Sequence, residues 1–99
     1  MPRPRRCRRI GHRPGVTYFK PAGVRMQNLN EIILSVDEYE SVRLSDLEGL
    51  DQIKSAKKMN ISQPTFQRLI KGARKKISDA LINGKAIKIE GGNVSFNEK

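Results

Sequence analysis

The stretch DQIKSAKKMNISQPTFQRLIK, residues 51 to 71, decides the fold that we predict for this chain. Asp51 is a favourable N-cap for a short helix that runs to Met59, and Ser62 is a favourable N-cap for a second helix. Between the two helices, Asn60 can adopt the positive φ that a tight turn requires. A short helix, a tight turn and a longer helix are the spacing of a helix-turn-helix.

The longer helix carries a strongly amphipathic pattern. Its apolar residues recur every three or four positions, at Phe66, Leu69, Ile70, Ala73, Ile77, Ala80 and Leu81. Asn83 and Gly84 mark its end, which gives a helix about 30 Å long. The shorter helix is expected to bury Ile53, Ala56 and Met59.

If the apolar stripe of the longer helix faces the core, polar residues of its first turns must face outward. These candidate DNA-contact residues are Ser62, Gln63, Pro64, Thr65, Gln67, Arg68 and Lys71. Glutamine at 63 or 67 could pair with adenine, arginine at 68 could pair with guanine, and the remaining donors suit phosphate contacts. The alternative interpretation is a three-helix core whose basic face is simply solvated.

A first helix is predicted to begin at Asp37, because Glu40 three residues later completes a capping-box pattern. The helix should run to about Glu48, where Gly49 can take the left-handed conformation that ends a helix. Its expected buried stripe consists of Tyr39, Val42 and Leu47. The acidic residues on this helix indicate either a solvated face or a docking surface for a basic protein or a second copy of the chain.

Short β-prone segments flank the helices. Val16–Phe19 and Ile32–Val36 precede the first helix, as strands or extended connectors. After the last helix, the apolar alternation before and after Gly91-Gly92 predicts a β-hairpin. The predicted fold is therefore mainly α, with a three-helix helix-turn-helix domain at residues 16–99 and a helix-turn-helix core at about 37–83.

Residues 1–15 alternate proline, arginine and glycine, a composition that cannot bury enough apolar surface to become ordered. We interpret them as a flexible basic arm, and we expect that residues 1–9 can be deleted without loss of the fold. Arg3, Arg5 and Arg6 are suited to phosphates or to a narrow minor groove. A tail that only increases solubility has the same composition.

The charge distribution indicates a polyanionic partner. The 99 residues include 20 Lys and Arg against 10 Asp and Glu, a formal net charge of +10. The basic residues gather before residue 31 and after residue 51, and an acidic segment separates them. DNA, RNA or an anionic membrane would fit, but no apolar run approaches the roughly 20 residues of a membrane span. We expect a cytoplasmic protein with no membrane partner.

Catalysis is not indicated by the sequence. One His and one Cys, with acids concentrated on one predicted helix, provide no evident set of nucleophile, base and orienting group. Cys7 and His12 are too few to complete a tetrahedral zinc site, and no phosphate-binding loop is present. The expectation is a protein with no enzymatic activity, no metal and no cofactor.

Scattered short motifs add a resemblance that covers about residues 2 to 92. They are Pro2-Arg3-Pro4, Phe19-Lys20-Pro21-Ala22-Gly23, Asp37-Glu38, Arg43-Leu44, Asp46-Leu47-Glu48-Gly49, Met59, Ser62, Thr65-Phe66, Arg68, Ala73-Arg74-Lys75-Lys76, Ala80-Leu81, Gly84-Lys85 and Ile89-Glu90-Gly91-Gly92. The chain resembles an uncharacterised family of small prokaryotic proteins predicted to bind DNA, whose helix-turn-helix looks like region four of the major bacterial sigma factor. Ser55, Asn60 and Gln63 depart from the common family residues, and Gln63 stands where arginine is frequent, so no base preference is carried over.

These observations predict a DNA-binding protein that acts as a transcriptional regulator on double-stranded DNA. Two other classes of function remain open: an adaptor that docks on the transcription machinery, such as RNA polymerase, and a non-specific RNA binder. The chain has only five aromatic residues, whereas RNA-binding proteins usually stack bases on aromatic side chains. Many helix-turn-helix proteins bind paired half-sites as dimers, so a homodimer is also open.

Overall fold

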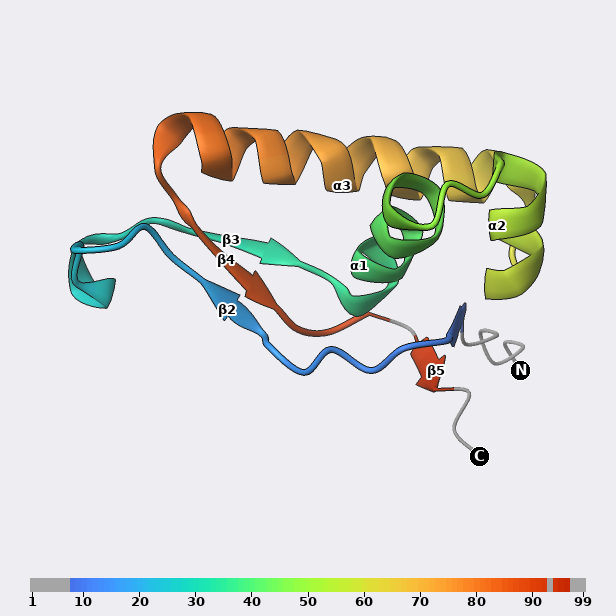
Figure 1. The fold of residues 1–99 in the computed structure, drawn as a ribbon, viewed down its shortest axis with the longest axis horizontal. Coiled ribbons are helices and arrows are strands. Elements are labelled where there is room, and N and C mark those ends of the chain that lie inside the picture. The colour runs from blue at the N-terminus through green and yellow to red at the C-terminus, as the bar shows by residue number, and fades with distance from the viewer. Residues whose placement is uncertain (1–7, 93, 97–99) are drawn as a thin grey trace, which may run out of the picture.

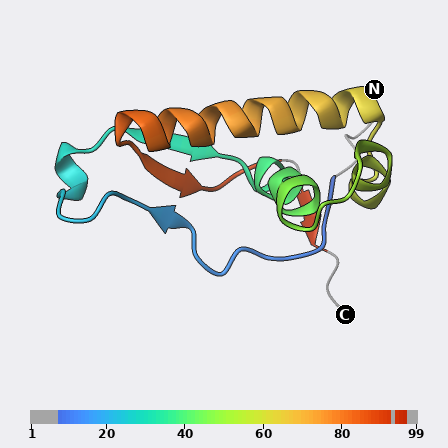
Figure 2. The ribbon, with the colours of Figure 1, turned by 45° about the horizontal axis from the view of Figure 1, so that its top comes forward.

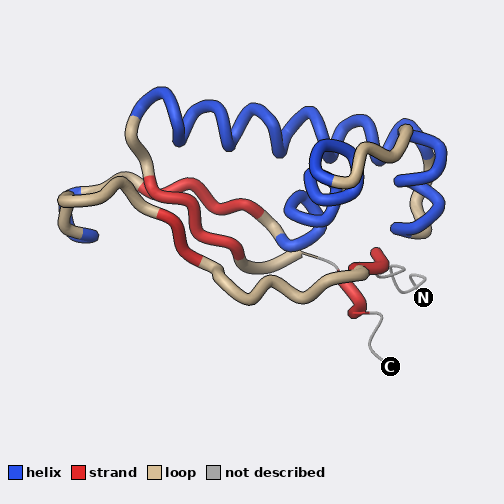
Figure 3. Tube along the Cα trace, in the orientation of Figure 1, coloured by secondary structure: helices blue, strands red, loops and turns tan. Residues whose placement is uncertain are grey.

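The computed structural model describes residues 8–92 and 94–96, in which three α-helices pack against short strands. The longest helix, α3, forms one long edge of the molecule, and the other elements lie on one side of this helix (Figures 1 and 3). The elements are β1 (Arg8–Ile10), β2 (Tyr18–Phe19), the 3-10 turn η1 (Met26–Asn28), β3 (Glu31–Leu34), α1 (Val36–Val42), the π-helix η2 (Arg43–Leu47), α2 (Gln52–Met59), α3 (Gln63–Asn83), β4 (Ala86–Ile89) and β5 (Val94–Phe96). The prediction of a mainly helical chain is confirmed for the described residues.

β4 is the central strand of a sheet with the order β2-β4-β3. It runs antiparallel to β2 and parallel to β3, and Ile87 lies opposite both Phe19 and Ile32. Because β3 and β4 run in the same direction, the chain between them must cross the length of the sheet, and α1, α2 and α3 make this crossing. α3 consequently lies along one face of the sheet (Figure 2). The predicted β-prone segment at 16–19 contains β2, and the segment at 32–36 overlaps β3, which begins one residue earlier.

The predicted C-terminal hairpin is wrong. Within the described residues, β4 pairs only with β2 and β3, whereas β5 pairs in parallel with β1, with Val94 opposite Arg8. Gly91 and Gly92 have φ values of 77° and 104° and lead the chain away from the sheet. A Cβ on Gly92 would lie 2.8 Å from Oδ1 of Asp37, so the chain passes close to α1 here. An alternating pattern identifies strands, but it does not determine which strands pair.

The N-cap of the first helix lies two residues before the predicted cap at Asp37. β3 ends at Leu34, and Ser35 is the N-cap of α1. The Ser35 hydroxyl oxygen accepts a hydrogen bond from the Glu38 backbone N–H at 3.3 Å, and the Glu38 carboxylate accepts one from the Ser35 N–H at 3.0 Å. A capping box is therefore present, with Ser35 and Glu38 in place of Asp37 and Glu40.

α1 continues directly into η2, where the backbone hydrogen bond from Glu48 N–H to the Arg43 carbonyl oxygen spans five residues. This wider turn changes which side chains face the core. Leu44 is buried, whereas Leu47 is 80% exposed. The prediction that Leu47 belongs to the buried stripe is wrong, because a uniform helical period does not include the extra residue of a π turn.

The predicted ends of the other two helices are confirmed. Asp51 caps α2 and Ser62 caps α3. Asn60 ends α2 in the left-handed conformation with φ 59°, and Gly84 ends α3 with φ 64°. Gly49, with φ 74°, follows the end of η2 as predicted.

Two residues predicted to be buried lie at the surface instead. Ile53 is 60% exposed, and Ser55 takes its place beside Ala56 on the buried face of α2. Leu81 is 80% exposed, because it follows Ala80, the last buried residue of α3. The remaining apolar residues of the α3 stripe are buried or half-buried as predicted.

The core consists of two clusters that α3 joins. One contains Ile10, Leu44, Ala56, Met59, Phe66 and Ile70, and the other contains Leu34, Ala73 and Ile89. α3 contributes Phe66 and Ile70 to the first cluster and Ala73 to the second. The first cluster therefore fixes the N-terminal end of α3 against α2, whereas the second cluster packs the helix against the sheet.

Ile10 corrects the prediction of a flexible arm at residues 1–15. Residues 8–10 form β1, and Ile10 is 1% exposed within the first core cluster. Arg8 forms an ion pair with Asp37 at 3.0 Å, and the Gly11 N–H donates to a Glu40 carboxylate oxygen at 2.8 Å. The described fold therefore begins at Arg8, eight residues before the predicted start of the domain at residue 16.

Candidate nucleic-acid interface

The connection between α2 and α3, residues 60–62, holds the start of α3 at the surface. The Ile61 N–H donates to the Ala56 carbonyl oxygen at 3.0 Å, which closes the C-terminal end of α2. Met59 and Phe66, one on each side of this connection, are fully buried. The buried side chains of Met59 and Phe66, together with the Ser62 cap, fix the position of the first two turns of α3.

The structure brings the predicted α3 contact residues together at this corner. Residues that are exposed to solvent are Ser62, Gln63, Pro64, Gln67, Arg68 and Lys71, and Thr65 is half-buried. Phe66 and Ile70, which alternate with them, point into the core. One end of α3 therefore presents amide, hydroxyl, guanidinium and ammonium groups on its outer side.

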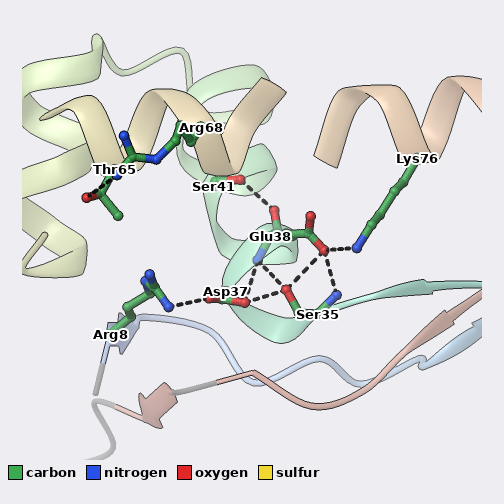
Figure 4. A network of polar contacts seen from close by, with 8 residues as sticks. All are labelled: Arg8, Ser35, Asp37, Glu38, Ser41, Thr65, Arg68 and Lys76. Atoms are coloured by element: carbon green, nitrogen blue, oxygen red, sulfur yellow. Dashed lines mark hydrogen bonds and ion pairs between the residues drawn. The ribbon is translucent and has the colours of Figure 1, made fainter. Parts of the chain in front are cut away.

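A short chain of hydrogen bonds links three of these residues. The Ser62 hydroxyl donates to the Thr65 hydroxyl oxygen at 2.8 Å, and Nη2 of Arg68 donates to the same oxygen at 3.4 Å. Figure 4 shows the Arg68 side chain extended back along α3 to Thr65. The guanidinium group is therefore directed toward the helix start, beside the exposed glutamines.

The cations on the exposed sides of α2 and α3 have no acidic partner within 4 Å among the residues that the structure describes. They are Lys54, Lys57 and Lys58 on α2 and Arg68, Lys71 and Lys75 on α3. Of these six, the sequence prediction included only Arg68 and Lys71. Helical spacing could have found Lys75, since it follows Lys71 by one turn.

Two other cations of α3 are paired with acids of the first helical segment. Arg74 binds Asp46 through two hydrogen bonds, of 2.6 and 3.1 Å, and Lys76 binds Glu38 at 2.7 Å. The hydrogen bonds from Arg74 lower the pKa of Asp46 below its usual value and, in return, raise the pKa of Arg74. These cations hold α3 against α1 and η2, so their charge is already compensated.

The acids at the start of α1 are buried, which overturns the prediction of a solvated acidic face. Asp37, Glu38 and Glu40 are each less than 9% exposed. Figure 4 shows Glu38 between Ser35 and Lys76, and Asp37 between Ser35 and Arg8. These carboxylates fasten β1 and α3 to α1, and they present little surface to another protein.

The chain is similar to a protein family over almost its whole length. The model of a family described as "Protein of unknown function DUF134" matches residues 1–97. The chain belongs to this family. The predicted resemblance to an uncharacterised family of small prokaryotic proteins is thereby confirmed.

Relatives of this family member share more than half of its residues. A UPF0251 protein of Thermoanaerobacter sp. (strain X514) is 54% identical over 99 residues, which cover 100% of this chain and 88% of that protein. A UPF0251 protein of Moorella thermoacetica is 55% identical over 92 residues, which cover 93% of this chain and 62% of that protein. One of Dehalococcoides mccartyi (strain BAV1) is 56% identical over 92 residues, with coverages of 93% and 79%. No solved structure matches the chain.

The remaining sequence predictions for this family member concern the N-terminal segment. Arg3, Arg5, Arg6 and Cys7 lie outside the described residues. His12 is exposed, and the described part of the chain contains no group of three or more His, Cys, Asp or Glu side chains arranged to hold a metal ion. The helices described here also include none that is long and apolar enough to cross a membrane.

Proposed function

We propose that this protein binds double-stranded DNA through a helix-turn-helix made by α2 and α3, with α3 as the recognition helix, and that it regulates transcription. The observation that carries the proposal is the separation of charges on the two helices. The exposed cations around the α2–α3 corner lack acidic partners in the described structure, whereas Arg74 and Lys76 are used to hold the fold. Cations that are not held in ion pairs within the fold are available to phosphates.

The corner also offers groups that can discriminate bases. An α-helix fits the major groove of B-DNA, and the first turns of a recognition helix contact base edges there. Gln63 and Gln67 can pair with adenine, and Arg68 can pair with guanine in a bidentate manner. The exposed lysines of α2 and of the outer side of α3 suit phosphate contacts. This arrangement supports a likeness to region four of the major sigma factor.

The basic N-terminal residues extend this proposal. β1 lies beside β5 and contacts α2 and α1, so the described chain begins close to the helices. The sequence before it contains Arg3, Arg5 and Arg6, whose guanidinium groups suit phosphates or a narrow minor groove.

Selection of bound sequences from random duplexes, followed by a salt titration on the enriched duplex, tests the proposal. We expect one sequence to be enriched and its affinity to fall with salt, by about 0.9 in the logarithmic slope for each neutralised phosphate. The same sequence as single-stranded and hairpin RNA is the control. Equal binding to RNA would favour the non-specific RNA binder, and absence of enrichment would favour the adaptor; either result contradicts the proposal.

Substitution of Arg3, Arg5 and Arg6 by alanine tests the arm separately. If all three contact phosphates, the salt slope flattens by up to about 2.7, since each contact contributes about 0.9. A minor-groove role additionally predicts a larger loss on duplexes flanked by A-tracts than on duplexes with G·C-rich flanks. Equal slopes for the wild type and the triple variant would remove these residues from the DNA interface.

A further inference from the structure

An apolar groove runs between α3 on one side and β2, β4 and η2 on the other. One half has a volume of about 370 Å³ and extends to Leu81, and the other has a volume of about 330 Å³ and extends to Leu47. Phe19, Ile77 and Ile87 line both halves, so the two hollows form one groove along α3.

The groove is bordered by large apolar side chains that the fold leaves uncovered. Leu47 and Leu81 are each 80% exposed, at opposite ends of the groove, and Phe19 at its middle is 52% exposed. Single exposed apolar residues are common on protein surfaces, but a contiguous apolar groove with protruding leucines at both ends is typical of an interaction site.

Lys20, which lines one half of the groove, donates to the backbone carbonyl oxygens of Pro21 and Val24, and other charged residues around the groove are held in ion pairs. These pairs are Arg43–Glu48, Arg74–Asp46 and Lys85–Asp79. This face therefore differs from the α2–α3 corner, where cations have no acidic partner. A polyanion would gain little electrostatic attraction at this face, and a second copy of this basic chain would meet little local charge repulsion.

Residues 1–7 and 97–99 do not have the composition of an occupant. Residues 1–7 contain three arginines and two prolines, and residues 97–99 are Asn, Glu and Lys. Neither segment has the run of large apolar side chains that would fill a groove of this length.

We propose that the groove is the interface of a homodimer, in which Leu81 of each copy enters the Leu47 half of the other. A two-fold contact requires one surface that is complementary to itself, and this groove has both a protruding leucine and a hollow at each end. The two-fold axis passes through Phe19, Ile77 and Ile87, which the two halves share. The two grooves then run antiparallel, with the Leu81 end of each one facing the Leu47 end of the other.

The same arrangement fits paired DNA half-sites, and this step alone rests on the proposed function. α3 runs along the groove with its outer side on the long edge of the molecule, away from the sheet (Figures 1 and 2). Gln67 precedes Ile77 by ten residues, or about 15 Å along the helix. The two-fold axis therefore separates the two recognition segments by about 30 Å, close to the 34–36 Å between successive major grooves on one side of DNA.

Sedimentation of the full chain without DNA tests the dimer. We expect twice the monomer mass of 11.2 kDa at micromolar concentration. Leu81→Glu and Leu47→Glu should each raise the dimer dissociation constant by about tenfold or more, because each places a charge in the apolar contact. Both side chains are exposed, so the folded monomer should melt normally.

Ile82→Glu is the matched control, since Ile82 is 79% exposed on the same helix but does not line the groove. This variant should remain dimeric. A monomeric wild type, or equal dissociation of the Leu81 and Ile82 variants, would overturn the inference. A dimer that binds no DNA would support the interface and overturn the proposed function. If the protein binds DNA, Leu81→Glu should still bind a single half-site, but it should lose the added affinity of binding two half-sites at once.

Discussion

Two faces of α3 carry the same kinds of side chain and have different roles. On the outer face, Arg68, Lys71 and Lys75 have no acidic partner among the described residues, whereas on the face toward α1 and η2, Arg74 and Lys76 are bound to buried or half-exposed carboxylates. The net charge of the helix does not separate these roles. What separates them is the neighbouring element, which supplies acids to one face only.

The comparison therefore assigns the binding function to the outer face and a structural function to the inner face. A basic helix in a small domain is often interpreted from its total charge. Here the cations available to a polyanion are fewer than the sequence indicates, and they are concentrated near the α2–α3 corner. Four predictions can break this comparison or sharpen it.

Phe66→Ala should strongly destabilise the domain and thereby disrupt both faces of α3. Phe66 is fully buried where α2 meets α3, and loss of such an aromatic side chain typically costs about 3 to 5 kcal/mol. Thermal unfolding monitored by circular dichroism measures the effect. Ile82→Ala, on the same helix, should change the stability by less than about 0.5 kcal/mol because the side chain is exposed and does not line the groove. An unchanged transition for Phe66→Ala would contradict the packing of α3 described here.

Ile10→Ala should destabilise the domain by roughly 2 kcal/mol or more, because it removes a buried side chain from the core beneath the corner. Deletion of residues 1–7 provides the comparison, since these residues precede β1. Urea unfolding of the two variants should show a clearly lower midpoint for Ile10→Ala only. Equal midpoints would indicate that β1 contributes nothing to the core.

Arg68→Ala and Arg74→Ala should have opposite consequences, although both remove a guanidinium group from α3. Arg68→Ala should weaken specific DNA binding by roughly 1 to 3 kcal/mol and relax the preference at one base position, with little change in melting temperature. Arg74→Ala should leave the base preference intact and lower the stability by no more than about 1 kcal/mol. Binding of both variants to a panel of single-base duplex variants measures the base preference, and thermal melting measures the stability. Equal losses on every sequence would make Arg68 a phosphate contact.

The smallest effect concerns the Asp46–Arg74 pair. Hydrogen bonds from Arg74 lower the pKa of Asp46 in the folded state, so the pair stabilises the fold above the pKa of the unfolded carboxyl, near 3.8. This contribution is lost as the pH falls through the folded-state pKa. Because the pair is solvent-exposed, we expect less than about 1 kcal/mol. The melting temperature of the wild type should exceed that of Asp46→Asn at pH 6, and the two should converge below pH 3.

Local signals in the sequence predicted the helices well. Asp51 and Ser62 are caps, Asn60 and Gly84 end helices with positive φ, and the stripe through Phe66 is buried. Each of these features depends on residues within a few positions of one another, so they can be found without knowledge of the tertiary fold.

Features that depend on distant contacts were missed. The pairing of β4 with β3, and of β5 with β1, depends on which strands meet in space, and alternation of apolar residues does not specify this. The burial of Asp37 and Glu38 depends on cations from β1 and α3, which neutralise carboxylates that the sequence places on an apparently solvated face. Ile10 was hidden among arginines and prolines, because one apolar residue carries no periodic signal.

The candidate site was predicted in part for the same reason. The exposed residues at the start of α3 follow from helical periodicity once Phe66 faces inward. The three lysines of α2 could not be separated from Arg74 and Lys76 by charge alone, because the distinction depends on acids that are distant in the sequence. Arg3, Arg5 and Arg6 remain a prediction.

The parallel pairing of β3 with β4 has a consequence for the order of folding. Every α-helix of the described chain lies between these two strands, so their pairing closes a long loop at a large entropic cost. α2 and α3 are neighbours in the chain and pack against each other, so they can form early, whereas the β3–β4 pairing requires the intervening chain to be compact. The folding nucleus is therefore expected at the α2–α3 corner, and the strands join last. Because β4 is also the strand to which β2 attaches, the N-terminal half of the chain reaches its final position only after the C-terminal half has been made.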